Sequence, residues 1–98
     1  MSKLESKFQK ELMDEIRGLY PGCLITKNDS GYIQGIPDWT ILYKDKWAVL
    51  EVKRDRNAAK QPNQKYYVDK LNDMSFSRIV YPENKDDVLR DLKQVFEG

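Results

Sequence analysis

The segment Trp47–Lys53 is the part of this 98-residue chain that most restricts its fold. Its apolar side chains alternate between the two faces of an extended strand, with Trp47 and Val49 on one face and Ala48, Leu50 and Val52 on the other. A strand that is apolar on both faces has to lie inside a sheet, with other elements packed on both sides. The segment therefore predicts a helix-covered sheet with this strand at its centre.

The neighbouring segments alternate between strand and helix patterns. Residues 38–43 and 47–53 form the arms of a predicted β-hairpin. We expect helices over residues 2–20, 61–71 and 84–97, and further strands over 23–26 and 76–81. The order is α-β-β-β-α-β-α, and the helix before the last strand is long enough to return that strand in parallel. The sequence predicts a single α/β domain over residues 1–98, a mixed sheet flanked by helices with an additional C-terminal helix.

Composition excludes several classes of site. With no histidine and one cysteine, the chain cannot build a Cys/His zinc site, a Ser-His or Cys-His nucleophile pair, or an intramolecular disulfide. Catalysis would have to rest on carboxylates, lysines or hydroxyl groups. No apolar run approaches the ~18 residues that span a bilayer, and the first residues lack the apolar segment of a secretory signal. We expect a cytoplasmic protein without membrane association.

The charge of the chain is concentrated in its middle third. The formal net charge is +1, but residues 44–70 carry eight basic and four acidic side chains. Four cations are candidates for contacts with nucleic-acid phosphates: Lys27, Arg54, Arg56 and Lys60. The alternative is a solvated basic loop without a ligand.

The tripeptide Glu51-Val52-Lys53 places a carboxylate and an ammonium on the same face of the central strand. Burying an unpaired charge costs several kcal/mol, so Glu51 needs either an ion-pair partner or a metal ion. A two-residue hairpin loop places Asp38 opposite Glu51 or Lys53, on their face, whereas a three-residue loop without a bulge turns it to the other face. We expect the two-residue loop, which gathers two carboxylates and one lysine. A simple cross-strand ion pair is the alternative.

Two carboxylates without histidine suit a hard, partly hydrated cation, Mg²⁺ or Mn²⁺, better than zinc. Such ions act on phosphates. A lysine beside the ion can orient the attacking water, help to deprotonate it, or neutralise charge on the phosphoryl oxygens.

The order Gly35-x-Pro37-Asp38, then Glu51-x-Lys53 after twelve residues, then Gln64 in the next helix, resembles the PD-(D/E)XK nuclease superfamily. More narrowly, it is similar to the small stand-alone phage form of the virus-type replication-repair nuclease (VRR-NUC) family, whose pattern is G-x-P-D, E-x-K and Q. The resemblance covers roughly residues 4–71. It implies a restriction-endonuclease-like α-β-β-β-α-β core and, if the chain is phage-encoded, a location in the host cytoplasm.

The resemblance also implies roles for individual residues in a Mg²⁺-dependent phosphodiesterase, with Mn²⁺ as a substitute. Asp38 and Glu51 would be metal ligands, the carbonyl of Val52 a further ligand, Lys53 the catalytic lysine and Gln64 a residue lining the site. The family also uses a glutamate from the first helix. At about 100° per residue, Glu5 lies about 30° from the centre of the apolar stripe, Glu15 about 50° and Glu11 about 90°. Glu5 is the best candidate, although it could instead form a capping box with Ser2.

The implied function is a DNA endonuclease that acts on branched DNA as a homodimer, with resolution of four-way (Holliday) junctions as the favoured activity. One site cuts one strand, so symmetric cutting of two strands requires two copies of the chain. The alternatives are a flap- or nick-directed nuclease of the same fold, a restriction-type endonuclease, a non-catalytic nucleic-acid-binding module, and an accessory protein whose charge pairs are only structural.

Overall fold

The computed structural model describes residues 3–98, and its elements follow the predicted order. They are α1 (Lys3–Leu19), β1 (Leu24–Lys27), β2 (Trp39–Tyr43), β3 (Lys46–Val52), α2 (Pro62–Met74), β4 (Ser77–Val80) and α3 (Lys85–Glu97), with a short 3₁₀ helix at Pro82–Asn84. Ser2, where we expected the first helix to begin, lies outside the described residues. The predicted α/β class with a C-terminal helix is confirmed.

The four strands form one mixed sheet in the order β1-β2-β3-β4. The β1–β2 and β2–β3 pairs are antiparallel and the β3–β4 pair is parallel. Because parallel neighbours need a long crossover connection, α2 fills the connection between β3 and β4, as the sequence predicted. β3 lies inside the sheet, and every residue of β3 from Ala48 to Val52 is buried.

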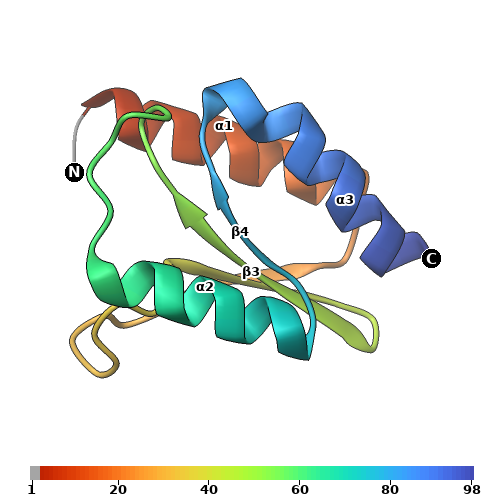
Figure 1. The fold of residues 1–98 in the computed structure, drawn as a ribbon. Helices are drawn as coiled ribbons and strands as arrows, with labels where there is room; N and C mark the ends of the chain where they lie inside the picture. Colours follow the sequence, from red (N-terminus) through yellow and green to blue (C-terminus); the bar gives the residue numbers. More distant parts are fainter. Residues whose placement is uncertain (1–2) are drawn as a thin grey trace.

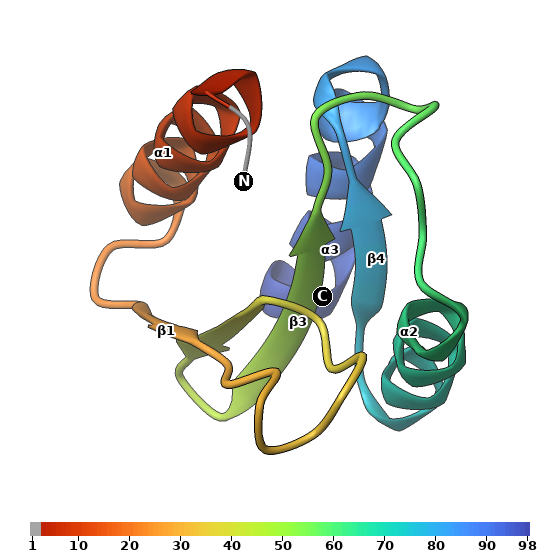
Figure 2. The same cartoon turned by 90° about the vertical axis from the view of Figure 1, so that its left-hand side faces the viewer.

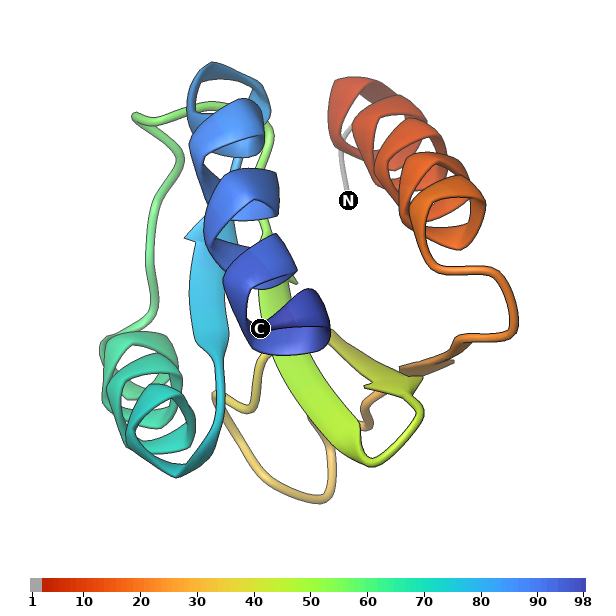
Figure 3. The ribbon, with the colours of Figure 1, turned by 90° about the vertical axis from the view of Figure 1, so that its right-hand side faces the viewer.

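The helices cover the two faces of the sheet unequally. α1 and α3 lie on one face and α2 on the other (Figure 1). The views from the two sides show α1 and α3 on the same side of the strands and α2 on the opposite side (Figures 2 and 3). The main core lies under α1 and α3 and includes Leu12, Ile16, Ile41, Leu50, Val52, Phe76, Val80, Leu92 and Phe96. α2 contributes Val68 as its buried residue. No helix within residues 3–98 has the length and apolar character that crossing a bilayer requires.

The buried face of α1 differs from the predicted stripe. Leu4 and Leu19 are 68% and 52% exposed, whereas Met13 and Gln9 are buried beside Phe8, Leu12 and Ile16. The contact face is rotated towards Met13, which leaves Leu4 at its border, and Leu19 is the last residue of the helix. This rotation moves Glu5 closer to the centre of the sheet-facing side.

The β2–β3 hairpin has the predicted two-residue loop, Lys44-Asp45, which connects the paired residues Tyr43 and Lys46. Lys44 has φ 56°. A positive φ in a two-residue loop matches the right-handed twist of the strands that it joins. The loop thus fixes the register of the whole hairpin, including the site at its far end.

Candidate active site

The hairpin register brings Asp38 and Glu51 together. Trp39 pairs with Leu50, so one step further along the two strands Asp38 lies opposite Glu51. Opposite residues of an antiparallel pair project to the same face. That face is the one covered by α2, because Leu50 and Val52 point into the core on the other side. The predicted meeting of the two carboxylates across β2 and β3 is therefore what the structure shows.

Glu51 is held by two neighbours. Its side chain is 3% exposed, and the Lys53 Nζ lies 3.5 Å from its Oε2. The Nε2 of Gln64 donates a hydrogen bond of 3.1 Å to the same oxygen. The other oxygen, Oε1, is buried and has no donor among the described residues. One oxygen of Glu51 is thus fixed by the protein, and the other remains available to a cation.

The electrostatics of the pair are unfavourable without such a cation. Burial, together with the adjacent Asp38 carboxylate, raises the pKa of Glu51 to about 7, and the Lys53 ammonium only partly opposes this rise. The Asp38 and Glu51 carboxyl groups lie close enough for the charge of one to disfavour ionisation of the other. When both are ionised, two negative charges share one buried pocket with a single ammonium. A divalent cation is the group that this donor set fits.

Pro37 directly precedes Asp38 and carries no backbone N–H that could pair with β3. The β2–β3 pairing ends at Trp39 and Leu50, so Pro37 lies two residues before the first paired residue of β2. The Pro37 carbonyl accepts a hydrogen bond from Asn28 Nδ2, at 2.8 Å. The role of the Val52 carbonyl as a ligand stays a prediction.

Gln64 is positioned by the first turn of α2. Its Oε1 accepts a hydrogen bond of 3.1 Å from the backbone N–H of Gln61, the residue before the helix. This contact orients the amide so that its Nε2 faces Glu51. Pro62 occupies the first helical position, where a missing N–H costs nothing. Gln64 is thus fixed at both ends of its amide.

The helix carboxylate is not part of the observed pair. Within the described residues, no group of three or more acidic or cysteine side chains gathers into a metal-binding cluster. Glu5 is half-buried in the first turn of α1, whereas Glu11 is exposed and Glu15 is exposed and bonded to Lys85 Nζ at 2.8 Å. These surroundings favour Glu5 over the other two, and its part in the site stays a prediction.

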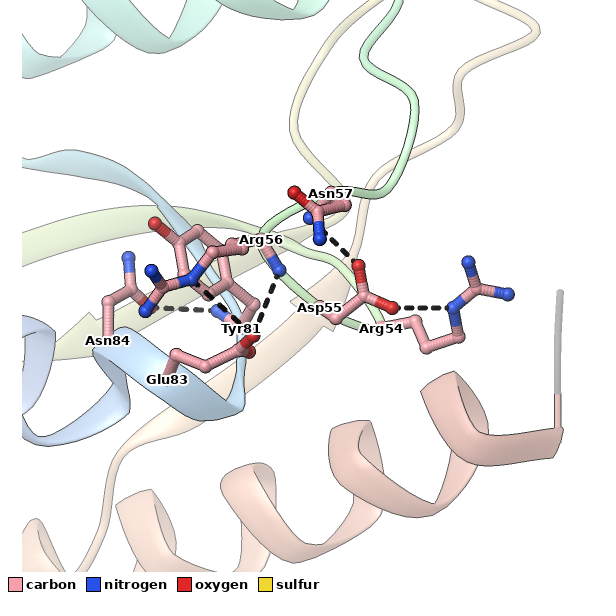
Figure 4. Close-up of polar contacts among 7 residues, drawn as sticks. All are labelled: Arg54, Asp55, Arg56, Asn57, Tyr81, Glu83 and Asn84. Carbon is pink, nitrogen blue, oxygen red and sulfur yellow. Dashed lines mark hydrogen bonds and ion pairs between the residues drawn. The ribbon is translucent and has the colours of Figure 1, made fainter.

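The predicted phosphate-binding residues lie in different surroundings. Arg54 and Arg56 follow β3, and both are paired with carboxylates: Arg54 with Asp55 at 3.0 Å and Arg56 with Glu83 at 3.6 Å (Figure 4). Lys60 borders a cavity between α2 and β4. Lys27 lies on the β1 edge, with its Nζ 5.6 Å from the centre of the Trp39 ring. Arg54, Arg56 and Lys60 thus lie on the loop between β3 and α2, whereas Lys27 lies away from it on β1.

Comparison with known proteins supports the fold. Neither a protein-family model nor a curated protein sequence matches the chain. Two solved structures match it in three dimensions. One, described as a VRR_NUC domain, has a TM-score of 0.73 and 22% identity and covers 91% of this chain and 97% of its own. The other, described as a VRR_NUC domain protein, has a TM-score of 0.66 and 18% identity, with 99% and 91% covered. The chain therefore has the fold of VRR_NUC domains, as its motifs predicted.

Proposed function

We propose that this protein is a divalent-metal-dependent DNA endonuclease. The observation that carries the proposal is the convergence of Asp38, Glu51, Lys53 and Gln64 at one end of the β2–β3 hairpin, with one buried Glu51 oxygen left without a donor. The fold of VRR_NUC domains supports the same function. Burying acidic groups in this way destabilises a protein that has no cation to place there.

Asp38 and Glu51 would hold Mg²⁺ or Mn²⁺, with the Val52 carbonyl and Glu5 as further ligands. Bound there, the ion would supply charge neutralisation for a phosphodiester and lower the pKa of a water molecule. The residues of the chain do the positioning. Gln64 keeps Glu51 in one orientation, and Lys53 places its ammonium where it can orient water or neutralise charge that develops on the phosphoryl oxygens.

We further propose branched DNA as the substrate and a homodimer as the active form, with four-way junctions preferred. A chain with one such site cuts one strand, so paired cuts in a junction require two copies. Arg54 and Arg56 follow the site directly on the loop after β3 and would meet the backbone of DNA bound there.

The test is cleavage of duplex, flap, nicked and four-way-junction DNA, offered side by side with Mg²⁺ or Mn²⁺. Lys53→Ala is the inactive variant, and Lys93→Ala, an exposed lysine on α3, is the matched control. We expect junction cleavage by the wild type and the control, with a loss of at least about 100-fold in Lys53→Ala. Cleavage of flaps or nicks alone would replace the junction assignment. Tight binding without cleavage in either metal would identify a non-catalytic binding module and refute the proposal.

A further inference from the structure

A cleft of about 750 Å³ opens beside the carboxylate pair. One wall is the turn segment of residues 30–36, and the other is the beginning of α2, residues 61–64. In Figure 1 this segment lies next to the first turn of α2. Asp38 and Gln64 both line the cleft, so a ligand inside it would share a border with whatever the site binds. The sequence did not indicate this cleft, because nothing local relates residues 30–36 to α2.

The lining of the cleft is polar but almost uncharged. Gln34, Gln61, Asn63 and Gln64 contribute side-chain amides, and among the described residues Asp38 is the one acidic side chain of the lining. Within residues 3–98, no hydrogen bond occupies the side chains of Gln34 and Asn63. A free amide offers both a donor and an acceptor. Ile36 and Pro62 add apolar surface.

This chemistry does not suit a phosphate. Within the part of the chain that the structure describes, neither lysine nor arginine lines the cleft, and the Asp38 carboxylate would repel an anion. It suits a flat, neutral group with donors and acceptors on its edge, which is the chemistry of a nucleobase. The volume lies within the range of pockets that enclose small organic ligands.

The cleft is formed before any ligand arrives. Gly35 has φ +91°, and a side chain at this position would place its Cβ 2.3 Å from the Cβ of Asn63. The turn segment therefore packs directly on α2 through a position that only glycine fits. Asn28 fixes the same segment, donating to the Pro37 carbonyl at 2.8 Å and accepting from Thr40 Oγ1 at 3.0 Å. Because the cleft is already ordered, ligand binding loses less conformational entropy there.

From this geometry we propose that the cleft receives one unpaired nucleobase of the DNA, adjacent to the phosphodiester at Asp38 and Glu51. This inference rests on the proposed nuclease function and adds a base-binding subsite to it. A base has to leave its stack to enter the cleft, which costs least where the DNA is already unpaired or distorted. The subsite thereby favours branch points over regular duplex, without any contact that reads a long sequence.

The experiment places 2-aminopurine, whose emission rises on unstacking, at each position around the cut site of a junction. Emission is recorded with the wild type and no divalent metal, and Mn²⁺ is then added to follow cleavage of the same DNA. The test variant is Gln34→Ala/Asn63→Ala, which removes two amides and keeps the Asn63 Cβ that contacts Gly35. Gln94→Ala, an exposed glutamine on α3, is the matched control.

We expect emission to rise at one position beside the cut. The double variant should lose this rise and bind about tenfold more weakly, on the scale of one base contact, while Gln94→Ala behaves as wild type. An abasic nucleotide at that position should weaken wild-type binding equally and abolish the difference between wild type and double variant. Cleavage without a responding position, or a double variant that binds as wild type does, would refute the base subsite and leave the nuclease intact. Absence of cleavage in Mn²⁺ and in Mg²⁺ would remove both proposals.

Discussion

Replacing Glu51 by glutamine tests the electrostatics of the site directly. The pKa of Glu51 is raised from 4.5 to about 7 in the folded protein, first by burial and then by the charge of Asp38. The folded chain therefore binds this proton more tightly than the unfolded chain does. It follows that the stabilisation from the protonated carboxyl is complete below about pH 4.5 and is lost as the pH rises through about 7.

The size of the effect follows from the two pKa values. Each pH unit between them corresponds to about 1.4 kcal/mol, so ionisation of Glu51 lowers the free energy of unfolding by about 3 kcal/mol at most at pH 8. The side chain is 3% exposed, so solvent screens little of this. Glutamine has the same shape, stays neutral, and can accept from Gln64 while donating to Asp38.

The assay is urea unfolding of wild type and Glu51→Gln at pH 5 and pH 8, with a chelator present. We expect the stability advantage of the variant to grow by about 2 to 3 kcal/mol from pH 5 to pH 8, and its melting temperature at pH 8 to exceed that of the wild type by on the order of 10 °C. Cleavage should be lost. Glu97→Gln, which is exposed at the end of α3, should show no such pH dependence. A variant no more stable than wild type at pH 8 would refute this account of the site.

Three further changes test the site and its supports. Mn²⁺ at pH 8 should raise the melting temperature of the wild type and leave that of Asp38→Asn unchanged; an equal rise in both would place the metal elsewhere. Gly35→Ala should lower the free energy of unfolding by about 2 to 4 kcal/mol, because the added Cβ would overlap α2 and the φ of Gly35 is +91°. Gly18→Ala is the control, since Gly18 faces open space on α1, and it should raise the free energy of unfolding by up to about 1 kcal/mol. Urea titrations measure both changes. Asn84→Ala should lower the free energy of unfolding by about 1 to 3 kcal/mol, because the Asn84 amide accepts from the Tyr81 N–H at 2.8 Å and donates to the Ile79 carbonyl at 3.0 Å. An unchanged free energy of unfolding would mean that water replaces both hydrogen bonds.

The sequence was enough to predict that Asp38 and Glu51 meet, because their meeting depends on residues close to them in the chain. The parity of a short hairpin loop decides which residue faces Glu51, and the apolar pattern of β3 decides which face is buried. These features need no knowledge of how the helices pack.

The remaining features depend on contacts between distant segments. Arg56 meets Glu83 across 27 positions, and Lys85 meets Glu15 across 70. The amide-lined cleft likewise exists only because Gly35 contacts Asn63. The predicted stripe on α1 was wrong at Leu4 and Leu19 for the same reason, because periodicity gives a helix face but not the extent of the surface that covers it.

The formal charges of the site relate the cost of leaving the two carboxylates without a cation to the charge of the proposed substrate. Ionised Asp38 and Glu51 contribute −2 and Lys53 contributes +1, so the pocket carries −1 without a ligand. A monovalent cation would neutralise it and leave nothing to attract an anion. A divalent cation brings the total to +1, the complement of the single negative charge of a phosphodiester. In the proposed site, Lys53 would make one bound divalent ion sufficient to reverse the sign of the pocket, which a carboxylate in its place would not do. If Glu5 joins the ligands, the total falls to zero, and binding of the phosphodiester then depends more strongly on the arginines that follow β3.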